Sequence, residues 1–240
     1  MERQAPMPRR TLDRFPVRQP SDAALRRYYR SYDGATLYHA PDTLPDITSA
    51  GLFGNARPLV LDLGCGRGEF LIAQAQRHPE RNHAGLDLQR KYLYDAVNHA
   101  EALDLDNLVF LRVDLHQALV KVPADTVAAI FLLFPPPVVK RKHLRKDVLT
   151  EAFIAGLARV LIPGGRMTFV TDHRPYFEQK RALLDTRFRR LLVSEGMEGG
   201  ITWFQRVWEG HGLPSLRAEY GKDCGPRPSE GCSLEREAGG

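Results

Sequence analysis

The sequence lacks the features that mark secreted and membrane proteins. Only three cysteines occur among its 240 residues, an odd and small number that supports no disulfide framework. The longest purely apolar run, Val127 to Phe134, is too short to span a bilayer. No apolar stretch follows the basic N-terminus, so no secretory signal is predicted. These absences predict a cytoplasmic protein that does not enter a membrane.

Metal-ligand patterns are missing as well. His143, His173 and His211 lack the spacing of a metal site, and Cys224 and Cys232 do not form a zinc pattern. The sequence therefore predicts no bound metal. No feature of it decides between a monomer and a homodimer.

Positive charge is unevenly distributed along the chain. Lys and Arg number 34 against 29 Asp and Glu, which gives a formal net charge of +5. Residues 1–30 contain eight arginines and three acidic residues, so they hold the whole excess and the remainder is neutral. Such an N-terminal arm is typical of proteins that bind a phosphate-bearing partner, although a solvated leader has the same composition.

Short apolar runs alternate with helical patterns through the middle of the chain. Strands are predicted at 59–63, 83–88, 108–113, 127–134 and 167–170, and helices at 69–78, 93–103, 149–161 and 176–188. Alternation at this spacing predicts an α/β fold with a mostly parallel, doubly wound sheet and helices on both faces. Two late segments, 201–207 and 215–220, predict a late antiparallel strand or hairpin.

Composition divides the chain into three regions. Residues 1–34 form the basic arm and a short helix, in which Ser21 or Asp22 is the cap and Tyr28, Tyr29 and Tyr32 share a face with Leu25. Residues 35–220 form the main domain, which begins with a linker or approach loop that reaches to residue 57. Residues 221–240 are rich in Gly, Pro, Ser and Glu and are predicted to be a disordered tail.

The most informative segment is the loop Asp62-Leu63-Gly64-Cys65-Gly66-Arg67-Gly68, between a predicted strand and a predicted helix. A glycine-rich turn at this place lets a ligand approach the backbone. The Gly-Lys-Ser/Thr of a P-loop is absent, and Glu69 stands where a dinucleotide fingerprint needs glycine or alanine. The acid two residues before the first glycine suits a cationic, phosphate-free ligand.

Two further acids follow the next two predicted strands. Asp87 lies 19 residues after Gly68, where a carboxylate binds ribose hydroxyls, and Asp114 is placed to accept a hydrogen bond from an adenine amine. An Asp after a strand is often only a turn or helix cap. Together with the glycine loop, however, Asp62, Asp87 and Asp114 favour a ligand at the carboxyl ends of the strands.

This stretch resembles the first motifs of S-adenosylmethionine-dependent methyltransferases, and later segments resemble one family of them. These segments are Phe134-Pro135-Pro136-Pro137-Val138 with the basic run Lys140 to Lys146, then Thr171-Asp172-His173-Arg174-Pro175-Tyr176, Thr202 to Arg206, and Gly210-His211-Gly212. In order and spacing they are similar to the bacterial tRNA (guanine-N7)-methyltransferase family. The resemblance runs from about Arg57 to Tyr220, with a weaker echo in Phe15-Pro16-Val17-Arg18.

The resemblance implies a Rossmann-like methyltransferase fold and transfer of a methyl group from S-adenosyl-L-methionine to N7 of guanine in tRNA, at guanine 46 of the variable loop. The residues it assigns to the methyl donor are Asp62, Gly64, Gly66, Gly68, Asp87 and Asp114. The residues it assigns to the tRNA and its guanine are Lys140, Asp172, Thr202, Phe204 and Gln205. Asp172 is the predicted catalytic residue.

Three positions depart from the family pattern. Pro136 and Val138 replace the Asp and Trp of Phe-Pro-Asp-Pro-Trp, and Gln205 replaces an acid. Guanine N7 has a free lone pair and needs no general base, so Asp172 could orient the base alone. Two alternatives follow from the departures: a methyltransferase of the same fold with another substrate, and a catalytically weakened relative that binds tRNA.

Both basic segments are predicted to contact RNA phosphates, which position a nucleic acid without reading its sequence. A run of charge is usually only a solvated face, but residues 140–146 stand beside the predicted site. We expect that deletion of residues 1–20 weakens tRNA affinity and its salt dependence and leaves donor binding intact.

Overall fold

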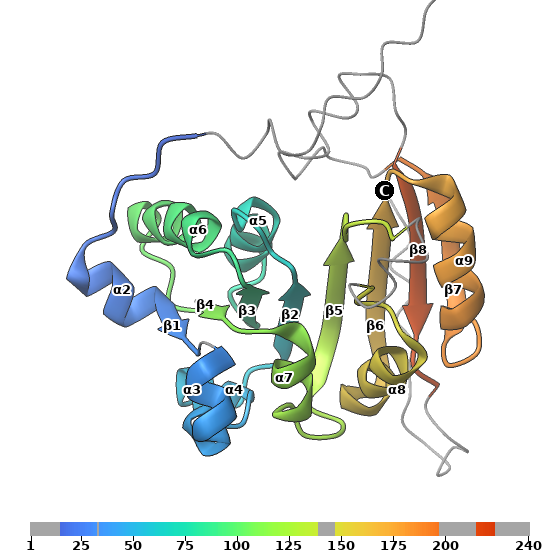
Figure 1. Ribbon diagram of the computed structural model, residues 1–240, viewed down its shortest axis with the longest axis horizontal. Coiled ribbons are helices and arrows are strands. Elements are labelled where there is room, and N and C mark those ends of the chain that lie inside the picture. The colour runs from blue at the N-terminus through green and yellow to red at the C-terminus, as the bar shows by residue number, and fades with distance from the viewer. Residues whose placement is uncertain (1–14, 33, 139–146, 197–214, 224–240) are drawn as a thin grey trace, which may run out of the picture.

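The apolar runs predicted as strands form the centre of a sheet in the computed structural model, which describes residues 15–32, 34–138, 147–196 and 215–223 (Figure 1). The strands are β1 (Tyr29–Ser31), β2 (Leu59–Leu63), β3 (Asn82–Asp87), β4 (Leu108–Arg112), β5 (Val127–Leu133), β6 (Leu161–Thr171), β7 (Arg189–Glu195) and β8 (Leu216–Gly221). The helices are α2 (Asp22–Tyr28), α3 (Gly34–His39), the 3-10 helix η1 (Pro41–Thr43), α4 (Ser49–Phe53), α5 (Glu69–Arg77), α6 (Arg90–Ala102), α7 (Leu115–Val120), α8 (Glu151–Val160) and α9 (Arg174–Leu184).

The eight strands of the described residues lie in the order β1-β4-β3-β2-β5-β6-β8-β7. Strands β1 to β6 pair in parallel, whereas β8 is antiparallel to both of its neighbours, β6 and β7. The predicted fold class, a mostly parallel doubly wound sheet with a late antiparallel strand, is therefore confirmed. The chain builds outward from β2 to β4 and then crosses back to β5, and ligands of open α/β sheets bind at such a reversal.

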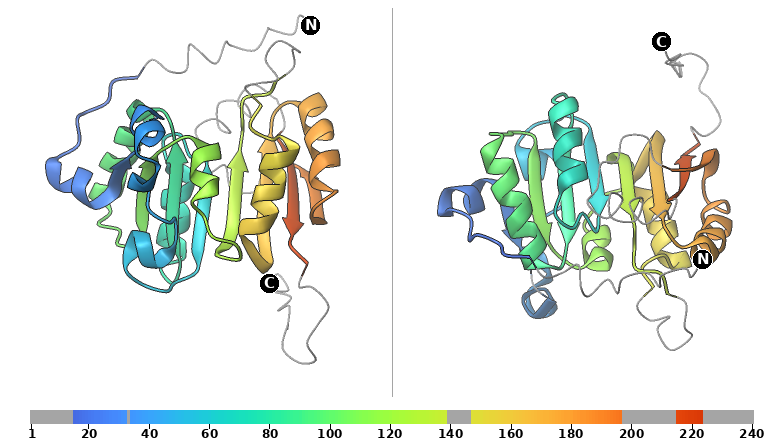
Figure 2. Two further views of the ribbon diagram at one scale, coloured as in Figure 1. Left: turned by 60° about the horizontal axis from the view of Figure 1, so that its bottom comes forward. Right: turned by 90° about the horizontal axis from the view of Figure 1, so that it is seen from above.

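Helices cover both faces of the sheet (Figure 2). Side chains of successive strand residues point to opposite faces. Strand β4 shows this, because Leu108 and Phe110 pack with α2, α5 and α6, while Val109 and Leu111 pack in the larger core with α7, α8 and α9. Within the described residues, none of these helices is both long and apolar enough to cross a membrane.

Two predictions near the N-terminus were wrong in part. Ser21 caps α2 as expected, since its Oγ accepts a hydrogen bond from the Ala24 N–H at 3.0 Å. The helix ends at Tyr28, however, and Tyr29 begins β1, which pairs with β4. Tyr29 and Tyr32 therefore do not share a helical face with Tyr28. Their segment pairs with β4 instead of continuing the helix.

The predicted linker before β2 is folded rather than irregular. It contains α3, η1 and α4, and its residues Leu37, Leu44 and Ile47 are buried in the larger core. The Ile47 N–H also donates to the carbonyl of Lys121 at 2.8 Å. These apolar residues have no regular spacing, so the sequence pattern did not indicate that this segment folds into short helices joined by buried turns.

Strand β7 was not predicted, and it is β7 that pairs with β8 on the side away from β6. Of the two segments predicted as late strands, 215–220 corresponds to β8, and 201–207 lies outside the described residues. The tail predicted from Gly221 begins too early, because Gly221 ends β8 and the Lys222 N–H donates to the Gly165 carbonyl at 2.9 Å. Residues 224–240 are outside the described part of the chain.

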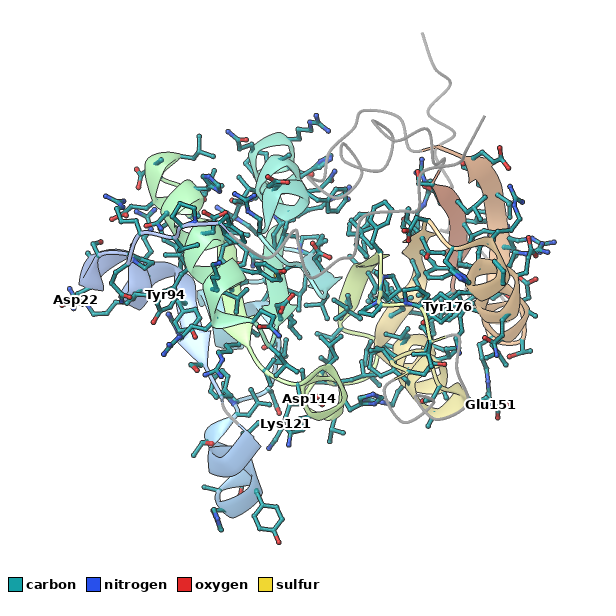
Figure 3. The ribbon with its side chains drawn as sticks, turned by 45° about the horizontal axis from the view of Figure 1, so that its top comes forward. Asp22, Tyr94, Asp114, Lys121, Glu151 and Tyr176 are labelled. Atoms are coloured by element: carbon teal, nitrogen blue, oxygen red, sulfur yellow. The ribbon has the colours of Figure 1, made fainter. Side chains whose placement is uncertain are left out.

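A buried ion pair joins the start of the α8 region to α9. The Lys180 ammonium contacts the Asp147 carboxylate, and their side chains are only 3% and 7% exposed. Lys180 Nζ also donates to the Leu149 carbonyl at 2.9 Å, and the Tyr176 hydroxyl donates to Asp147 Oδ1 at 3.1 Å. Tyr176, labelled in Figure 3, lies between α9 and β6, where burial raises the pKa of its phenol and the Asp147 carboxylate raises it further.

Candidate ligand-binding site

A cavity of about 410 Å³ opens at the carboxyl ends of β2, β3 and β5, where the order of the strands reverses. Its volume is that of a small-molecule site. The residues that line it are Phe15, Asp62, Leu63, Gly64, Cys65, Gly66, Arg67, Gly68, Glu69, Phe70, Asp87, Leu88, Gln89, Tyr92, Leu115, Leu132, Leu133, Phe134, Pro135, Pro136 and Val148. Five of the six predicted donor-site residues are among them.

The glycine loop turns sharply because three of its residues adopt left-handed backbone angles. Gly64, Gly66 and Gly68 have φ of +82°, +54° and +71°. A Cβ atom on Gly64 or Gly66 would meet open space, so the backbone there faces the cavity. A Cβ on Gly68 would lie 2.8 Å from Cε1 of Phe110, so this glycine lets α5 begin directly against the sheet.

Asp62 is a buried carboxylate without a full set of partners. It is 2% exposed, and its Oδ1 has no hydrogen-bond partner among the described residues. Burial raises the pKa of Asp62 to about 8, and the nearby Asp87 carboxylate adds to the increase. A buried acid of this kind beside a cavity is suited to a cationic group of a ligand, which would supply both the missing hydrogen bond and the opposite charge.

Asp87 holds the glycine loop in place. Its Oδ2 accepts a hydrogen bond from the Gly66 N–H at 3.0 Å, and its Oδ1 accepts one from the Gln89 N–H at 2.7 Å. Burial raises the pKa of Asp87 in spite of these bonds. Each carboxylate oxygen can accept more than one hydrogen bond, so acceptor capacity remains for hydroxyl groups of a ligand.

Asp114 has a structural role in the described chain. Its Oδ1 caps α7, accepting the N–H groups of His116 and Gln117 at 2.9 and 3.2 Å, and Figure 3 labels it at the start of this helix. Among the described residues, it is the adjacent Leu115 that lines the cavity rather than Asp114. The contact predicted between Asp114 and a ligand stays a prediction.

The Phe-Pro segment and Asp172 come together at the ends of neighbouring strands. The Phe134 N–H donates to the Val170 carbonyl at 2.8 Å, and Asp172, which follows β6 directly, is half-buried. Phe134 has a φ of +51°, a costly angle for a bulky residue and one typical of functional sites. Pro135 and Pro136 line the cavity, whereas Asp172 does not. The predicted substrate residues Lys140, Thr202, Phe204 and Gln205 lie outside the described residues.

Two aromatic residues of the cavity, Phe15 and Tyr92, are not predicted from the sequence. Phe15 precedes the glycine loop by more than forty residues, and its ring stacks on that of Tyr92 with centroids 5.8 Å apart. The weak resemblance to the family pattern at Phe15 to Arg18 was the only sequence signal for this segment, and it did not indicate that Phe15 lies at the cavity. Among the described residues, no group of three or more His, Cys, Asp or Glu side chains could hold a metal ion.

Comparison with known proteins gives both a family and a fold. Residues 56–202 match the model of the family described as "Putative methyltransferase". The tRNA (guanine-N(7)-)-methyltransferase of Rubrobacter xylanophilus is 36% identical over 89% of this chain and 98% of its own length. The enzyme of the same name from Chloroflexus aggregans is 38% identical over 86% of this chain and 94% of its own.

Solved structures agree with the fold at low sequence identity. The 16S rRNA methyltransferase KamB is 17% identical, with a TM-score of 0.56 over 73% of this chain and 94% of its own. A variant of the 16S rRNA (adenine(1408)-N(1))-methyltransferase from Catenulisporales acidiphilia, solved with the cosubstrate SAM, is 19% identical, with a TM-score of 0.51 over 76% of this chain and 92% of its own. These likenesses describe the architecture of the chain alone.

Proposed function

The chain belongs to the tRNA (guanine-N7)-methyltransferase family, and from this premise we propose that its cavity binds S-adenosylmethionine, the methyl donor. Its activity is the transfer of a methyl group from this donor to N7 of guanine in tRNA. The donor site is inferred from Asp62, a buried carboxylate that lines the cavity and whose Oδ1 has no hydrogen-bond partner among the described residues; the cationic donor would supply that partner.

The residues that line the cavity fit the chemistry of the donor. Asp62 would pair with the ammonium group of its methionine part, and Asp87 would accept hydrogen bonds from its ribose hydroxyls. The open space at Gly64 and Gly66 leaves room for a ligand against the backbone. Leu88 and Leu115 are apolar surfaces for a base. When bound, S-adenosylmethionine supplies an electrophilic methyl group on a sulfonium.

The acceptor side of the reaction requires orientation more than proton transfer. Guanine N7 attacks with a free lone pair, and the methylated base becomes positively charged. A carboxylate beside the base would hold its amino edge and stabilise the developing charge. We assign both roles to Asp172, which directly follows β6, two residues after the Val170 carbonyl that accepts from the Phe134 N–H, while Pro136 offers only an apolar surface.

The sequence supplies the surfaces that we assign to tRNA. The basic segment 140–146 follows the Phe-Pro turn, and the arm 1–14 enters the described chain at the donor cavity. We infer that both contact phosphates of tRNA, that the methylated base is guanine 46 of the variable loop, and that the reaction takes place in the cytoplasm. We keep Asp114 as a candidate for the adenine amine.

Incubation with labelled donor tests the proposed function directly. We expect purified protein to label unmodified tRNA, and chemical cleavage at N7-methylguanine to map the label to position 46. A transcript with adenine at this position is the matched control and should stay unlabelled. Donor binding with tight, salt-sensitive tRNA binding but no transfer would instead support a silent tRNA-binding relative. Transfer only to other molecules would point to a different substrate.

Replacing Asp172 with alanine should separate catalysis from donor binding. We expect the single-turnover rate to fall about 100-fold, because a misplaced base loses much of the advantage of orientation. The Kd for S-adenosylhomocysteine should not change, because Asp172 does not line the cavity. Quench-flow with excess enzyme gives the rate and calorimetry gives the Kd. An unchanged rate would remove Asp172 from the mechanism.

A further inference from the structure

An aromatic side chain from the N-terminal arm lies at the donor cavity. Phe15 is one of the lining residues, and its ring is nearly parallel to that of Tyr92, with an interplanar angle of 3°. Two cations also face it, with Cζ of Arg67 4.5 Å and Nζ of Lys91 4.3 Å from the ring centroid. A ring held by one stack and two cation–π contacts has a defined position at the rim.

The segment that carries Phe15 is anchored along α6. We call residues 15–21 the strap; it leads into α2 beside α6 (Figure 1). The Asn98 side chain donates to the Arg18 carbonyl at 2.9 Å, the Arg18 guanidinium lies 3.8 Å from Glu101, and the Ser21 hydroxyl donates to Glu101 at 2.6 Å. The strap is therefore attached to α6 at several points, and Phe15 extends from it to the cavity.

The place of Phe15 on the rim indicates which part of a ligand it would meet. Arg67 belongs to the glycine loop, and its Nε donates to Asp95 on α6 at 2.6 Å. Tyr92 follows Asp87 by five residues in the chain, and both line the cavity together with Gln89. Phe15 thus contacts the glycine loop and the first turn of α6, the helix that follows Asp87, so we place it on the side of the cavity where Asp87 would meet the ribose.

We propose that Phe15 is a donor-binding residue that the N-terminal strap contributes as a wall over the nucleoside side of the cavity. This inference rests on the proposed function, since it takes the cavity to be the donor site. The ring would exclude water from the bound donor and bury apolar surface against it. The arm therefore has two parts: the strap belongs to the donor site, and the four arginines upstream of Phe15 are assigned to RNA.

This division revises the expectation for truncation of the arm. Deletion of residues 1–20 was expected to leave donor binding intact, but it removes Phe15 from the lining of the cavity. Deletion of residues 1–14 removes four arginines, Arg3, Arg9, Arg10 and Arg14, and keeps the ring. The two truncations should therefore differ in donor affinity, while both weaken binding of tRNA.

Calorimetric titration of the full-length protein with S-adenosylhomocysteine and S-adenosylmethionine tests the wall. We expect Phe15→Ala and the deletion of residues 1–20 to raise the Kd for both ligands about tenfold, the loss of one buried aromatic contact. Phe15→Tyr and the deletion of residues 1–14 should stay within about twofold of wild type. Tyr38→Ala is the matched aromatic control, because Tyr38 on α3 is 82% exposed and does not line the cavity.

Thermal unfolding without ligand shows whether each variant is folded before its titration is compared. If folded Phe15→Ala bound both ligands with the wild-type Kd, the role of Phe15 in donor binding would be wrong, and the proposed function would be unaffected. A wild-type protein that binds neither ligand would overturn both, since the wall would then have nothing to cover. Equal weakening by the two truncations, with no effect of Phe15→Ala, would assign donor affinity to the upstream arginines and also reject the role of Phe15.

Discussion

Replacing Asp62 with asparagine is expected to remove donor binding and to stabilise the ligand-free protein. The unpartnered Oδ1 of Asp62 is the group that we assign to the donor's ammonium, and loss of one partner of a buried charge pair weakens binding by about 100-fold or more. The same burial raises the pKa of Asp62 to about 8, so without a cationic partner the site opposes ionisation of this acid. Asparagine keeps the shape and has no proton to lose.

The stabilisation should depend on pH in a defined direction. Between the ordinary pKa of 3.8 and the folded value of about 8, the folded protein keeps a proton that the unfolded chain releases. Stability from this group is therefore lost as pH rises through that window, by about 1.4 kcal/mol per unit at most. The difference in unfolding free energy between Asp62→Asn and wild type should increase from pH 4 to pH 8 and then stay constant, reaching on the order of a few kcal/mol.

Urea unfolding at several pH values, together with titration by S-adenosylhomocysteine, measures both effects. Asp42→Asn is the matched control, because this carboxylate is 99% exposed and pairs only at the surface with Lys121. Equal stability of wild type and Asp62→Asn at every pH would contradict the burial cost. Unchanged ligand affinity would contradict the pairing of Asp62 with the donor.

Replacing Lys180 with methionine is expected to cost about 3–5 kcal/mol of unfolding free energy, since it leaves the Asp147 carboxylate buried without its cation. The two side chains are almost fully buried, and the Tyr176 hydroxyl is the remaining side-chain partner shown for Asp147. Urea unfolding monitored by circular dichroism gives the change. The double variant Lys180→Met/Asp147→Asn should recover part of the loss, because no unpaired charge is then buried.

A surface pair provides the comparison for Lys180. Lys222 Nζ contacts Asp125 Oδ1 at 2.7 Å, but the Asp125 side chain is 55% exposed. Lys222→Met should cost no more than about 1 kcal/mol, because water and salt screen an exposed pair. If both methionine variants were equally stable, burial would not distinguish the two pairs and the cost assigned to Lys180 would be wrong.

The elements that the sequence revealed are those with apolar runs buried on both faces. Strand β2, for example, is buried along its whole length, and a short apolar run of this kind is typical of a central strand in a parallel sheet. Strand β7 was not predicted because its sequence does not alternate between apolar and polar residues. Most of its side chains, including Leu191, Leu192 and Val193, are exposed. Helix α7 was not predicted because it has only six residues, too few to show a helical period. Its N-cap, Asp114, has the position of a ligand-binding acid after a strand, so it does not by itself indicate a helix.

The candidate site also contains residues that the sequence predicts and residues that it does not. Asp62, the three glycines and Asp87 were predicted because spacing along one strand–loop–helix–strand unit, from β2 to β3, fixes their proximity in space. Phe15 reaches the same cavity through the strap, and no local pattern encodes a contact over so many intervening residues. The charge of the arm indicates a phosphate-bearing partner, but it carries no information about the position of the Phe15 ring.

The placement of β8 has a consequence for synthesis of the chain. Strand β8 lies between β6 and β7 in the sheet but is made after both of them. Until the ribosome has produced residues 216–221, β6 and β7 cannot complete their pairing and a nascent chain carries open strand edges. Every lining residue of the donor cavity in the described part of the chain lies at or before Val148. Translation therefore produces these lining residues before it produces the strand that completes the sheet.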